Sequence, residues 1–537
     1  MSSSSSPPVG LGLLFDTHAE RRQPTVFHLS RPFDIAPSAG TRFEVGALAE
    51  LVAEASGWLH AAGTKPGQRV AIVKDNHWDY VLLACAAARL GAIPSMVSNQ
   101  LPLDSLQSIL KRLEPAVLVT DTKVLARGDG AGADLTSLAT RTLSIDGASR
   151  GAVPLDDVRG TSAPAPRPVG PDEPMIVTHT SGTTGVPKLV VHSPNTIMGH
   201  LGRTESIRWP IVGMKRRDIV ATSISFCHMR IIPWTSGTLR LEPQKAVIVA
   251  DPEPEVAERV FREHPPNYLE ALPTVYIGWE PLAERPDNVF ADVRLYVSTF
   301  DAMHPPTVRK FLHASRRRFP AWLQGWGQSE TGPMTFRLLT RRSMAQQGNR
   351  HPTTRNVGRP IPGFTGLKVV DPKTMQPVKP GAPGVVLART NGRCLDYVGE
   401  HERWRNKAHE LWWNTGDFGI RKRTGEVMLL DREVDVIPEI SCIELEDVLA
   451  DRMPELAEAV IIGVPGKPPL PVLCMRDGKL DPATWRKATH DLPAMAEPVL
   501  LPWDQVPRTG TGKVRRVELR DQLLGFGSET YGLGKWT

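Results

Sequence analysis

A loop of small hydroxyl residues runs into a lysine at positions 177–193, which read VTHTSGTTGVPKLVVHS. The backbone N–H groups of such a Gly/Ser/Thr loop can form an anion-binding nest, to which the hydroxyls and Lys188 add donors and positive charge. A Walker A loop needs a hydroxyl residue after the lysine and a helix beyond it, but this chain has Leu189 and a strand pattern there. The residues therefore predict a phosphate cradle between two strands, with a flexible hairpin tip as the alternative.

The elements before this loop alternate between helix and strand patterns. Residues 47–63 place apolar side chains at helical spacing and end in glycine, and residues 68–74 read as a short β-branched strand. Residues 80–97 are the most apolar stretch, but an arginine, a glycine and a proline interrupt it, so they predict a buried helix and a strand rather than a membrane span. Residues 103–121 show another helix pattern followed by a strand pattern. This alternation predicts a parallel, doubly wound α/β sheet.

The pattern changes further along the chain. Residues 161–174 form a proline-rich, semi-extended connection, and residues 267–278 read as a strand or strand end. Beyond about residue 357, short strands and turns predict a small antiparallel sheet or barrel. A compact mixture of helices and strands follows, so we expect a domain boundary at Asp431–Asp435.

The composition is typical of a globular protein that does not bind nucleic acid. The net charge is +6, but the basic residues are spread along 537 residues with no basic and aromatic stripe, and the run Arg316–Arg318 is typical of a solvated helix face. The five cysteines lie far apart without metal-binding spacing, which predicts reduced, buried thiols in a cytoplasmic protein. Residues 1–15 lack a signal-peptide pattern and are expected to be a disordered lead.

Five motifs stand in the order of one known family. They are TSGTTG at 180–185, GWGQSETG at 325–332, WWNTGDFG at 412–419, DREVDVI at 431–437 and PRTGTGKVRR at 507–516. The sequence resembles, over nearly its whole length, the adenylate-forming (ANL) superfamily of acyl-CoA ligases, peptide-synthetase adenylation domains and luciferases. The resemblance implies a large domain of doubly wound sheets with a small β-barrel-like subdomain at 16–430. A hinge at 431–435 and a small mobile α+β domain at 436–537 would follow.

The resemblance implies an acyl-CoA ligase that converts a hydrophobic carboxylic acid, through an acyl-AMP, into a CoA thioester. Lys513 is expected to bridge the carboxylate, the α-phosphate and the ribose, and Glu330 to hold Mg²⁺, which prefers oxygen ligands. Asp417 would accept the ribose hydroxyls with Arg432 behind it. The remaining contacts to ATP or AMP are expected from the other residues that match the family's motifs: Thr180, Ser181, Gly182, Thr183, Thr184, Gly185, Lys188, Thr299, Phe300, Asp301, Trp326, Gly327, Gln328 and Ser329.

The organic acid is expected to lie against the segment 225–237. Its apolar and aromatic residues suit a hydrophobic acid. His228 and Trp234 are candidate wall residues, together with Gly325, and His228 is also a candidate catalytic residue.

The chain departs from the family at three places. Thr299 and Phe300 replace a Gly-Gly turn near the adenine, although glycine is used where backbone approaches a ligand closely. The hinge carries Val434, whose β-branched side chain stiffens the backbone. The glycine-rich stretch after the hinge, which borders the CoA tunnel in the family, is shortened around Pro438. These departures predict that the two half-reactions, adenylation of the acid and transfer of the acyl group to CoA, are not equally retained.

Four functions fit the residues. The leading one is the acyl-CoA ligase, similar to ligases of bacterial secondary metabolism such as the diterpenoid acid ligases of platensimycin and platencin biosynthesis. A half-reaction specialist would take acyl-AMP from a partner enzyme, and an adenylation enzyme would load a carrier protein. A non-catalytic ligand-binding protein is the fourth, and the joint retention of four residues argues against it: Lys513, Asp417, Arg432 and Glu330. The expected partners are a small acid and CoA, for a monomer or homodimer.

Overall fold

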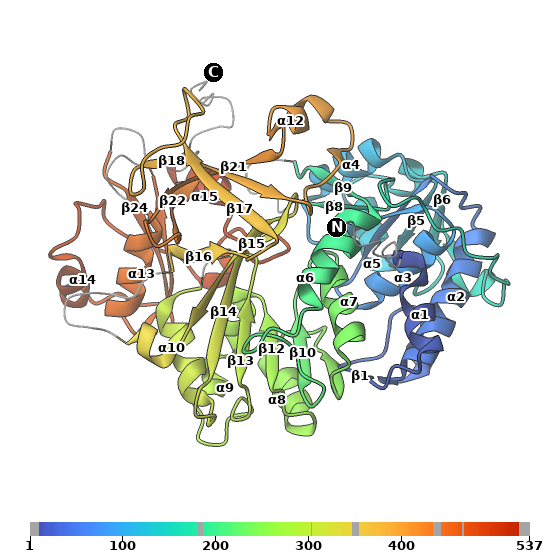
Figure 1. Cartoon of the computed structure of the whole chain (residues 1–537), viewed down its shortest axis with the longest axis horizontal. Helices are drawn as coiled ribbons and strands as arrows, with labels where there is room; N and C mark the ends of the chain where they lie inside the picture. The colour runs from blue at the N-terminus through green and yellow to red at the C-terminus, as the bar shows by residue number, and fades with distance from the viewer. Residues whose placement is uncertain are drawn as a thin grey trace, which may run out of the picture. The chain divides into compact units, whose positions relative to one another are not determined.

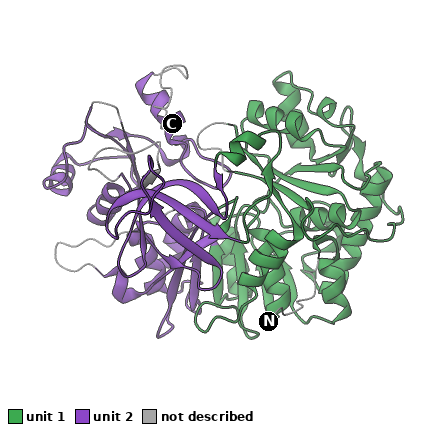
Figure 2. Cartoon of the chain, turned by 45° about the horizontal axis from the view of Figure 1, so that its top comes forward, with its two compact units in different colours: residues 1–270, 328–332, 391–406 green, residues 271–327, 333–390, 407–537 purple. Residues whose placement is uncertain are grey.

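The computed structural model describes residues 10–180, 186–301, 303–345, 354–432, 442–463 and 467–525. The chain, traced in Figure 1, divides into two compact units (Figure 2). Unit 1 comprises residues 1–270, 328–332 and 391–406, and unit 2 comprises residues 271–327, 333–390 and 407–537. Residues 181–185 of the phosphate loop, the hinge residue Val434 and the shortened stretch around Pro438 lie outside the described residues.

The first sheet of unit 1 has eight strands in the order β19-β9-β8-β4-β3-β5-β6-β7. β3 pairs in parallel with β4 and β5, and β5 pairs in parallel with β6, which confirms the predicted parallel sheet. The strands are β3 (Arg69–Lys74), β4 (Ile93–Ser98), β5 (Val117–Thr120), β6 (Arg141–Ser144), β7 (Val153–Pro154), β8 (Ile176–His179), β9 (Leu189–His192) and β19 (Asp396–Tyr397).

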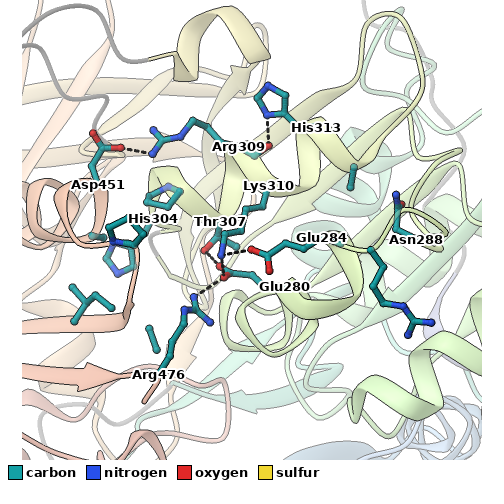
Figure 3. Close-up of a pocket in the computed structure, with 18 of the residues that line it drawn as sticks. Glu280, Glu284, Asn288, His304, Thr307, Arg309, Lys310, His313, Asp451 and Arg476 are labelled. Carbon is teal, nitrogen blue, oxygen red and sulfur yellow. Dashed lines mark hydrogen bonds and ion pairs between the residues drawn. The ribbon is translucent and has the colours of Figure 1, made fainter. Parts of the chain in front are cut away.

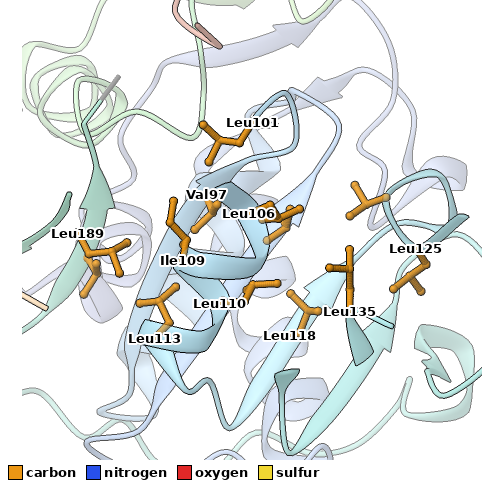
Figure 4. Packing of buried hydrophobic residues seen from close by; sticks show 14 of the residues in the cluster. Val97, Leu101, Leu106, Ile109, Leu110, Leu113, Leu118, Leu125, Leu135 and Leu189 are labelled. Atoms are coloured by element: carbon orange, nitrogen blue, oxygen red, sulfur yellow. The ribbon is translucent and has the colours of Figure 1, made fainter. Parts of the chain in front are cut away.

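Helices α2 (Val45–Ala61), α3 (Asp79–Arg89) and α4 (Leu103–Leu113) form where the helical spacing predicts them. α4 buries Leu106, Ile109, Leu110 and Leu113, which lie on one face at spacings of three and four residues. Figure 4 shows these side chains packed with residues of the sheet, among them Leu189 of β9. Leu189 is fully buried, so the residue after the loop lysine serves the core rather than a metal.

The second sheet of unit 1 runs in the order β12-β10-β11-β1-β2. β10 and β1 both pair in parallel with β11, and β2 pairs antiparallel with β1 at the edge. The strands are β1 (Val26–Leu29), β2 (Arg42–Phe43), β10 (Ile219–Ser223), β11 (Lys245–Ile248) and β12 (Tyr268–Ala271), and the helices beside them include α6 (Arg203–Glu205), α7 (Ile231–Leu241) and α8 (Pro254–Glu263).

The folded chain begins earlier than the sequence predicts. A short 3₁₀ turn at Leu11–Leu13 leads into α1 (Leu14–Glu20), and Leu11, Leu14 and Phe15 are buried. The disordered lead expected over residues 1–15 is therefore wrong for its last six residues, because their apolar side chains pack into a core. Residues 1–9 lie outside the described part of the chain.

Unit 2 contains a sheet in the order β17-β18-β21-β22-β16-β15-β14-β13. Its antiparallel pairs from β16 onward confirm the small antiparallel sheet predicted beyond residue 357. Residues 273–278 form the start of a helix instead of a strand, since Pro273 occupies its first turn. The elements are β13 (Leu295–Ser298), β14 (Ala321–Gln328), β15 (Gly332–Leu339), β16 (Asn356–Pro360), β17 (Thr365–Val370), β18 (Pro383–Thr390), β21 (Trp412–Arg421), β22 (Val427–Arg432), α9 (Pro273–Ala283) and α10 (Pro305–Ala314).

The C-terminal part of unit 2 is the predicted mixture of helices and strands. A three-stranded sheet of β23 (Leu456–Ile462), β24 (Leu470–Met475) and β25 (Val499–Leu500) lies with α13 (Cys442–Arg452), α14 (Pro482–Thr489) and α15 (Arg516–Leu524). All five cysteines are free and buried, as predicted. Within the described ranges, no helix combines the length and apolarity that crossing a bilayer requires.

Residues of this C-terminal part and of α9 and α10 line a polar groove of about 760 Å³ (Figure 3). The buried carboxylate of Glu280 accepts hydrogen bonds from Lys310 at 2.6 Å, from Arg476 at 2.5 Å and from Thr307. His304 contacts Asp447 of α13, with 3.2 Å between Nδ1 and Oδ1. Several ion pairs and hydrogen bonds therefore line this groove.

The pair of His304 and Asp447 predicts a pH-dependent stability. Burial alone lowers the pKa of His304, but the hydrogen bond and charge of Asp447 outweigh it and raise the pKa to about 9. The unfolded imidazole titrates near 6.5, so the stabilisation, about 3 kcal/mol, is complete below pH ~6.5 and is lost as pH rises through ~9. Urea unfolding at pH 6.5 and 9.5 should show this loss in the wild type and not in His304→Gln. Equal pH dependence in both proteins would contradict it.

Candidate active site

The ends of the phosphate loop are held together as a strand–loop–strand. β8 and β9 pair antiparallel, with His179 opposite Leu189. The Thr180 N–H donates to the Lys188 carbonyl at 3.0 Å, and the Lys188 N–H donates to the Thr180 hydroxyl at 3.1 Å. This confirms the predicted strand–loop–strand and fixes the backbone of Lys188 relative to the start of the loop.

Glu330 and Lys188 come together in unit 1, 142 residues apart in sequence. The Lys188 ammonium lies 3.3 Å from Glu330 Oε1, and the Tyr397 hydroxyl donates to the same oxygen at 2.6 Å. Burial and the Glu330 charge raise the pKa of Tyr397 far above its ordinary value, so the phenol stays a donor. Tyr397 thus orients the carboxylate expected to hold Mg²⁺, and it is a site residue that the sequence analysis missed.

His228 lies in a segment that follows β10. The amide of Asn76 fixes this segment, because it donates to the Ile224 carbonyl at 3.0 Å and accepts from the Phe226 N–H at 2.7 Å. The Nε2 atom of His228 lies 3.4 Å from the Ser329 hydroxyl, next to Glu330. Trp234 of α7 is 0% exposed, so His228 is the accessible member of the two wall residues predicted in this segment.

Arg230, two residues after His228, forms a buried ion cluster with two carboxylates. Its guanidinium donates two hydrogen bonds to Glu270, at 2.7 and 2.8 Å. It donates two more to Glu205, one of them at 3.0 Å and the other shorter. Burial alone would lower the pKa of Arg230, but the two carboxylates raise it well above its ordinary value. Gly237 of α7 makes room for Glu205, since a Cβ there would lie 2.8 Å from the Glu205 Cγ. The two carboxylates together exceed the charge of the guanidinium by one formal negative charge, a feature that the sequence analysis did not predict.

Unit 2 holds the residues expected to contact adenine and ribose. Asp417 is buried in β21, directly opposite Arg432 of β22. Trp326 of β14 packs against an apolar cluster that includes Met334. A Cβ on Gly325 would lie 3.3 Å from the Thr299 methyl group, so Thr299 fills the space above this glycine.

Phe300 adopts a backbone conformation that favours glycine. Its φ angle is +82°, in the left-handed region where a side chain costs about 1–2 kcal/mol. The Asp301 N–H donates to the Thr299 carbonyl at 3.1 Å and closes the turn. The chain therefore keeps a glycine-type turn while it carries a phenyl ring on it.

Two substitutions of Phe300 should distinguish the effect of its phenyl ring from the effect of the strained backbone. We expect Phe300→Gly to raise ATP–pyrophosphate exchange about ten-fold, because glycine both relieves the turn and removes a ring next to the expected adenine site. Phe300→Ala is the matched variant, since it removes the ring and keeps the Cβ. Unchanged exchange in both variants would contradict a crowding role for Phe300.

Lys513 sits at the tip of a preorganised turn in unit 2. The Thr509 N–H donates to the Lys513 carbonyl at 2.8 Å, and the Lys513 N–H donates to the Thr509 hydroxyl at 3.1 Å. Gly512 has a φ of +79°, and a Cβ on it would lie 2.5 Å from the Thr274 hydroxyl of α9. Glycine is required there, because the turn rests directly on the first residues of α9.

Comparison with known proteins identifies the family. The profile of the AMP-binding enzymes matches residues 15–398. The chain belongs to the AMP-binding enzyme family. It is thus an adenylate-forming enzyme of the ANL superfamily, and the predicted membership is confirmed. The enzymes of this family use ATP and Mg²⁺, and the assignment of residues 180–188 to phosphate binding stays a prediction.

Relatives of this AMP-binding enzyme have more than one activity. The chain is 37% identical to a 3-amino-2-hydroxy-4-methoxybenzoate diazotase of Streptomyces cremeus, over 98% of this chain and 97% of that protein. It is 25% identical to a 4-hydroxybenzoate/benzoate–CoA ligase of Rhodopseudomonas palustris, over 89% of both chains. The structure of the anthranilate–CoA ligase AuaEII with anthranoyl-AMP superposes with a TM-score of 0.79 at 19% identity, over 98% of this chain and all of that one. The predicted ANL fold is confirmed.

Proposed function

We propose that this adenylate-forming enzyme is an ATP-dependent diazotase, which activates nitrite and transfers its nitrosyl group to an aromatic amine. The observation that carries the proposal is the ion pairing of Arg230, on the segment expected to line the organic pocket, with two carboxylates, Glu205 of α6 and Glu270 of β12, which together exceed its charge by one formal negative charge. Such a charge suits a reaction that turns a neutral amine into a diazonium cation. The 37% identity to a diazotase over the whole chain supports the same reaction.

The proposed steps balance in atoms and electrons. A nitrite oxygen attacks the α-phosphorus of ATP, which forms the mixed anhydride of nitrite and AMP and releases pyrophosphate. The amine nitrogen then attacks the nitrosyl nitrogen, AMP leaves with the electron pair of the N–O bond, and the amine loses a proton. The resulting nitrosamine takes up a proton on oxygen and loses water to give the diazonium ion. No oxidant is needed, since nitrite already has the oxidation level of nitrous acid.

We assign the motif residues the roles in this reaction that the resemblance to the family implies. Lys188 neutralises phosphate charge, and Glu330, oriented by Tyr397, holds Mg²⁺. Asp417 binds the ribose, and Lys513 brings positive charge to the attacking oxyanion. Nitrite resembles a carboxylate in offering two oxygens with one shared charge, so the same machinery serves either nucleophile.

A second candidate is the acyl-CoA ligase that the five motifs imply. It would adenylate a carboxylic acid and pass the acyl group to CoA, and the 25% identical CoA ligase supports it. The half-reaction specialist and the carrier-loading enzyme are variants of this candidate. Both candidates use ATP and Mg²⁺, and they differ in the second substrate.

One assay distinguishes the diazotase from the acyl-CoA ligase. The purified protein is given Mg·ATP and 3-amino-2-hydroxybenzoate with either nitrite or CoA, and AMP is measured. The diazotase requires nitrite for AMP release and forms a product that couples with 2-naphthol to an azo dye. AMP release that requires CoA, with a thioester product, would instead establish the ligase.

A further inference from the structure

We infer that Arg112 is a positioning residue that ties the backbone before Lys188 to the segment carrying Tyr397, and so fixes both partners of the Glu330 carboxylate. All of these residues belong to unit 1. The inference rests on the proposed roles of Lys188 and Glu330 toward Mg·ATP, which the diazotase and the ligase share.

The guanidinium of Arg112 binds two acceptors that are far apart in the sequence. Arg112 lies in the last turn of α4. Its Nη2 atom donates to the Pro187 carbonyl at 2.7 Å, and its Nη1 atom donates to Oε2 of Glu400 at 2.5 Å. Because a guanidinium is planar and its donors point at fixed angles, these two hydrogen bonds fix the distance between the two acceptors. The side chains of Arg112 and Glu400 are 23% and 22% exposed, so solvent screens the pair only in part.

Each acceptor lies close in sequence to a residue that contacts Glu330. Lys188 directly follows Pro187, and its ammonium lies 3.3 Å from Oε1 of Glu330. Tyr397 lies three residues before Glu400, and its hydroxyl donates to the same oxygen at 2.6 Å. The Lys188 ammonium also lies 5.2 Å from the centre of the Tyr397 ring. The contacts therefore form a closed ring, in which the guanidinium joins the two arms that end at the carboxylate.

Lys188 lies one residue before the strand whose pairing joins the two segments. That strand, β9, pairs antiparallel with β19, and the Val398 N–H donates to the Leu189 carbonyl at 2.9 Å. The guanidinium of Arg112 extends the connection beyond these backbone hydrogen bonds, to the point where the loop joins β9. The lysine that is expected to meet phosphate is thereby held to the tyrosine segment as well as to its own strand.

This arrangement predicts a selective loss of affinity for a triphosphate. Residues that orient the ligands of a metal typically contribute about 10–100-fold to metal affinity or activity. Arg112→Ala should therefore weaken the binding of Mg·AMP-PNP about ten-fold or more, because Lys188 and Glu330 both lose their common support. AMP carries neither Mg²⁺ nor the two outer phosphates, so its affinity should stay close to the wild-type value.

Isothermal titration calorimetry of the full-length protein with Mg·AMP-PNP and with AMP tests the inference. The assay needs neither nitrite nor CoA, so its outcome does not depend on which reaction the protein performs. Glu400→Ala breaks the ring at its other arm and should weaken Mg·AMP-PNP by a similar factor. The double variant with Arg112→Ala should bind no more weakly than either single variant, since both changes open the same ring. Arg112→Lys can reach one acceptor but not both, and it should recover part of the affinity.

Arg403→Ala is the matched control. Arg403 is 48% exposed and donates to the other oxygen of Glu400 at 2.9 Å, so its removal leaves the ring intact and both affinities unchanged. An equal loss for AMP and Mg·AMP-PNP in Arg112→Ala would overturn the inference, because it would indicate a general structural role, and so would an unchanged affinity for Mg·AMP-PNP. A wild type that does not bind Mg·AMP-PNP would overturn the proposed use of ATP together with the inference, which distinguishes the two failures.

Discussion

Lys513→Ala is expected to lower ATP-dependent adenylate formation by about 10²–10³-fold. The attacking oxyanion and the α-phosphate repel each other, and the family places one lysine charge between them. The turn of residues 509–513 is held by its own hydrogen bonds and by the contact of Gly512 with Thr274. Loss of the side chain therefore removes charge from an otherwise intact turn.

The measurement for Lys513 is ATP–pyrophosphate exchange, which reports the first half-reaction. Lys479→Ala, an exposed lysine in another turn of unit 2, is the matched control and should keep wild-type exchange. Lys513→Arg keeps the charge with a different shape and should retain part of the activity. Exchange within about three-fold of wild type in Lys513→Ala would show that this lysine does not act in adenylation.

Glu205→Gln and Glu270→Gln are each expected to slow the amine-consuming step by about 30-fold. Either change makes the Arg230 cluster neutral. We assume a separation of about 8 Å between this charge and the developing cation, at which one unit charge contributes ~2 kcal/mol at an effective dielectric of 20, or about 30-fold in rate. ATP–pyrophosphate exchange with nitrite alone should change little, because that step develops no positive charge on the organic substrate.

Two readouts separate a charge effect from a structural one. The azo-coupling rate should fall similarly in both variants, since each removes the same charge from a different element. Glu258→Gln, which breaks an exposed helix pair with Arg262, is the control, and thermal melting verifies folding. A loss of exchange that parallels the loss of azo product would contradict a role confined to the amine step.

The sequence alone predicts those features that depend on neighbouring residues. The phosphate loop between two strands follows from a local pattern, and so does the amphipathic helix α4. Leu189 departs from a Walker loop because it fills the core under the same sheet. Such features are encoded within about ten residues of each other.

The contacts that the sequence does not predict join residues far apart in the chain. Tyr397 is hydrogen-bonded to Glu330, 67 residues away in the sequence, and Ser98 is hydrogen-bonded to His179, 81 residues away. Arg230 forms ion pairs with Glu205 and Glu270, which lie 25 and 40 residues away in the sequence. A lone tyrosine, serine or glutamate carries no periodic or spacing signal, so only the fold identifies these partners. Phe300 was noted as a departure, but its glycine-type φ angle required the structure.

Transfer of oxygen from labelled nitrite to AMP tests the central claim most directly. The protein is incubated with Mg·ATP, an aminobenzoate and ¹⁸O-nitrite, and the isolated AMP is analysed by mass spectrometry. If nitrite attacks the α-phosphorus and the N–O bond later breaks, one nitrite oxygen remains on the AMP phosphate. Unlabelled AMP formed alongside diazonium product would contradict adenylation of nitrite, and label that enters AMP only from an ¹⁸O-carboxylate would assign the chain to acid activation.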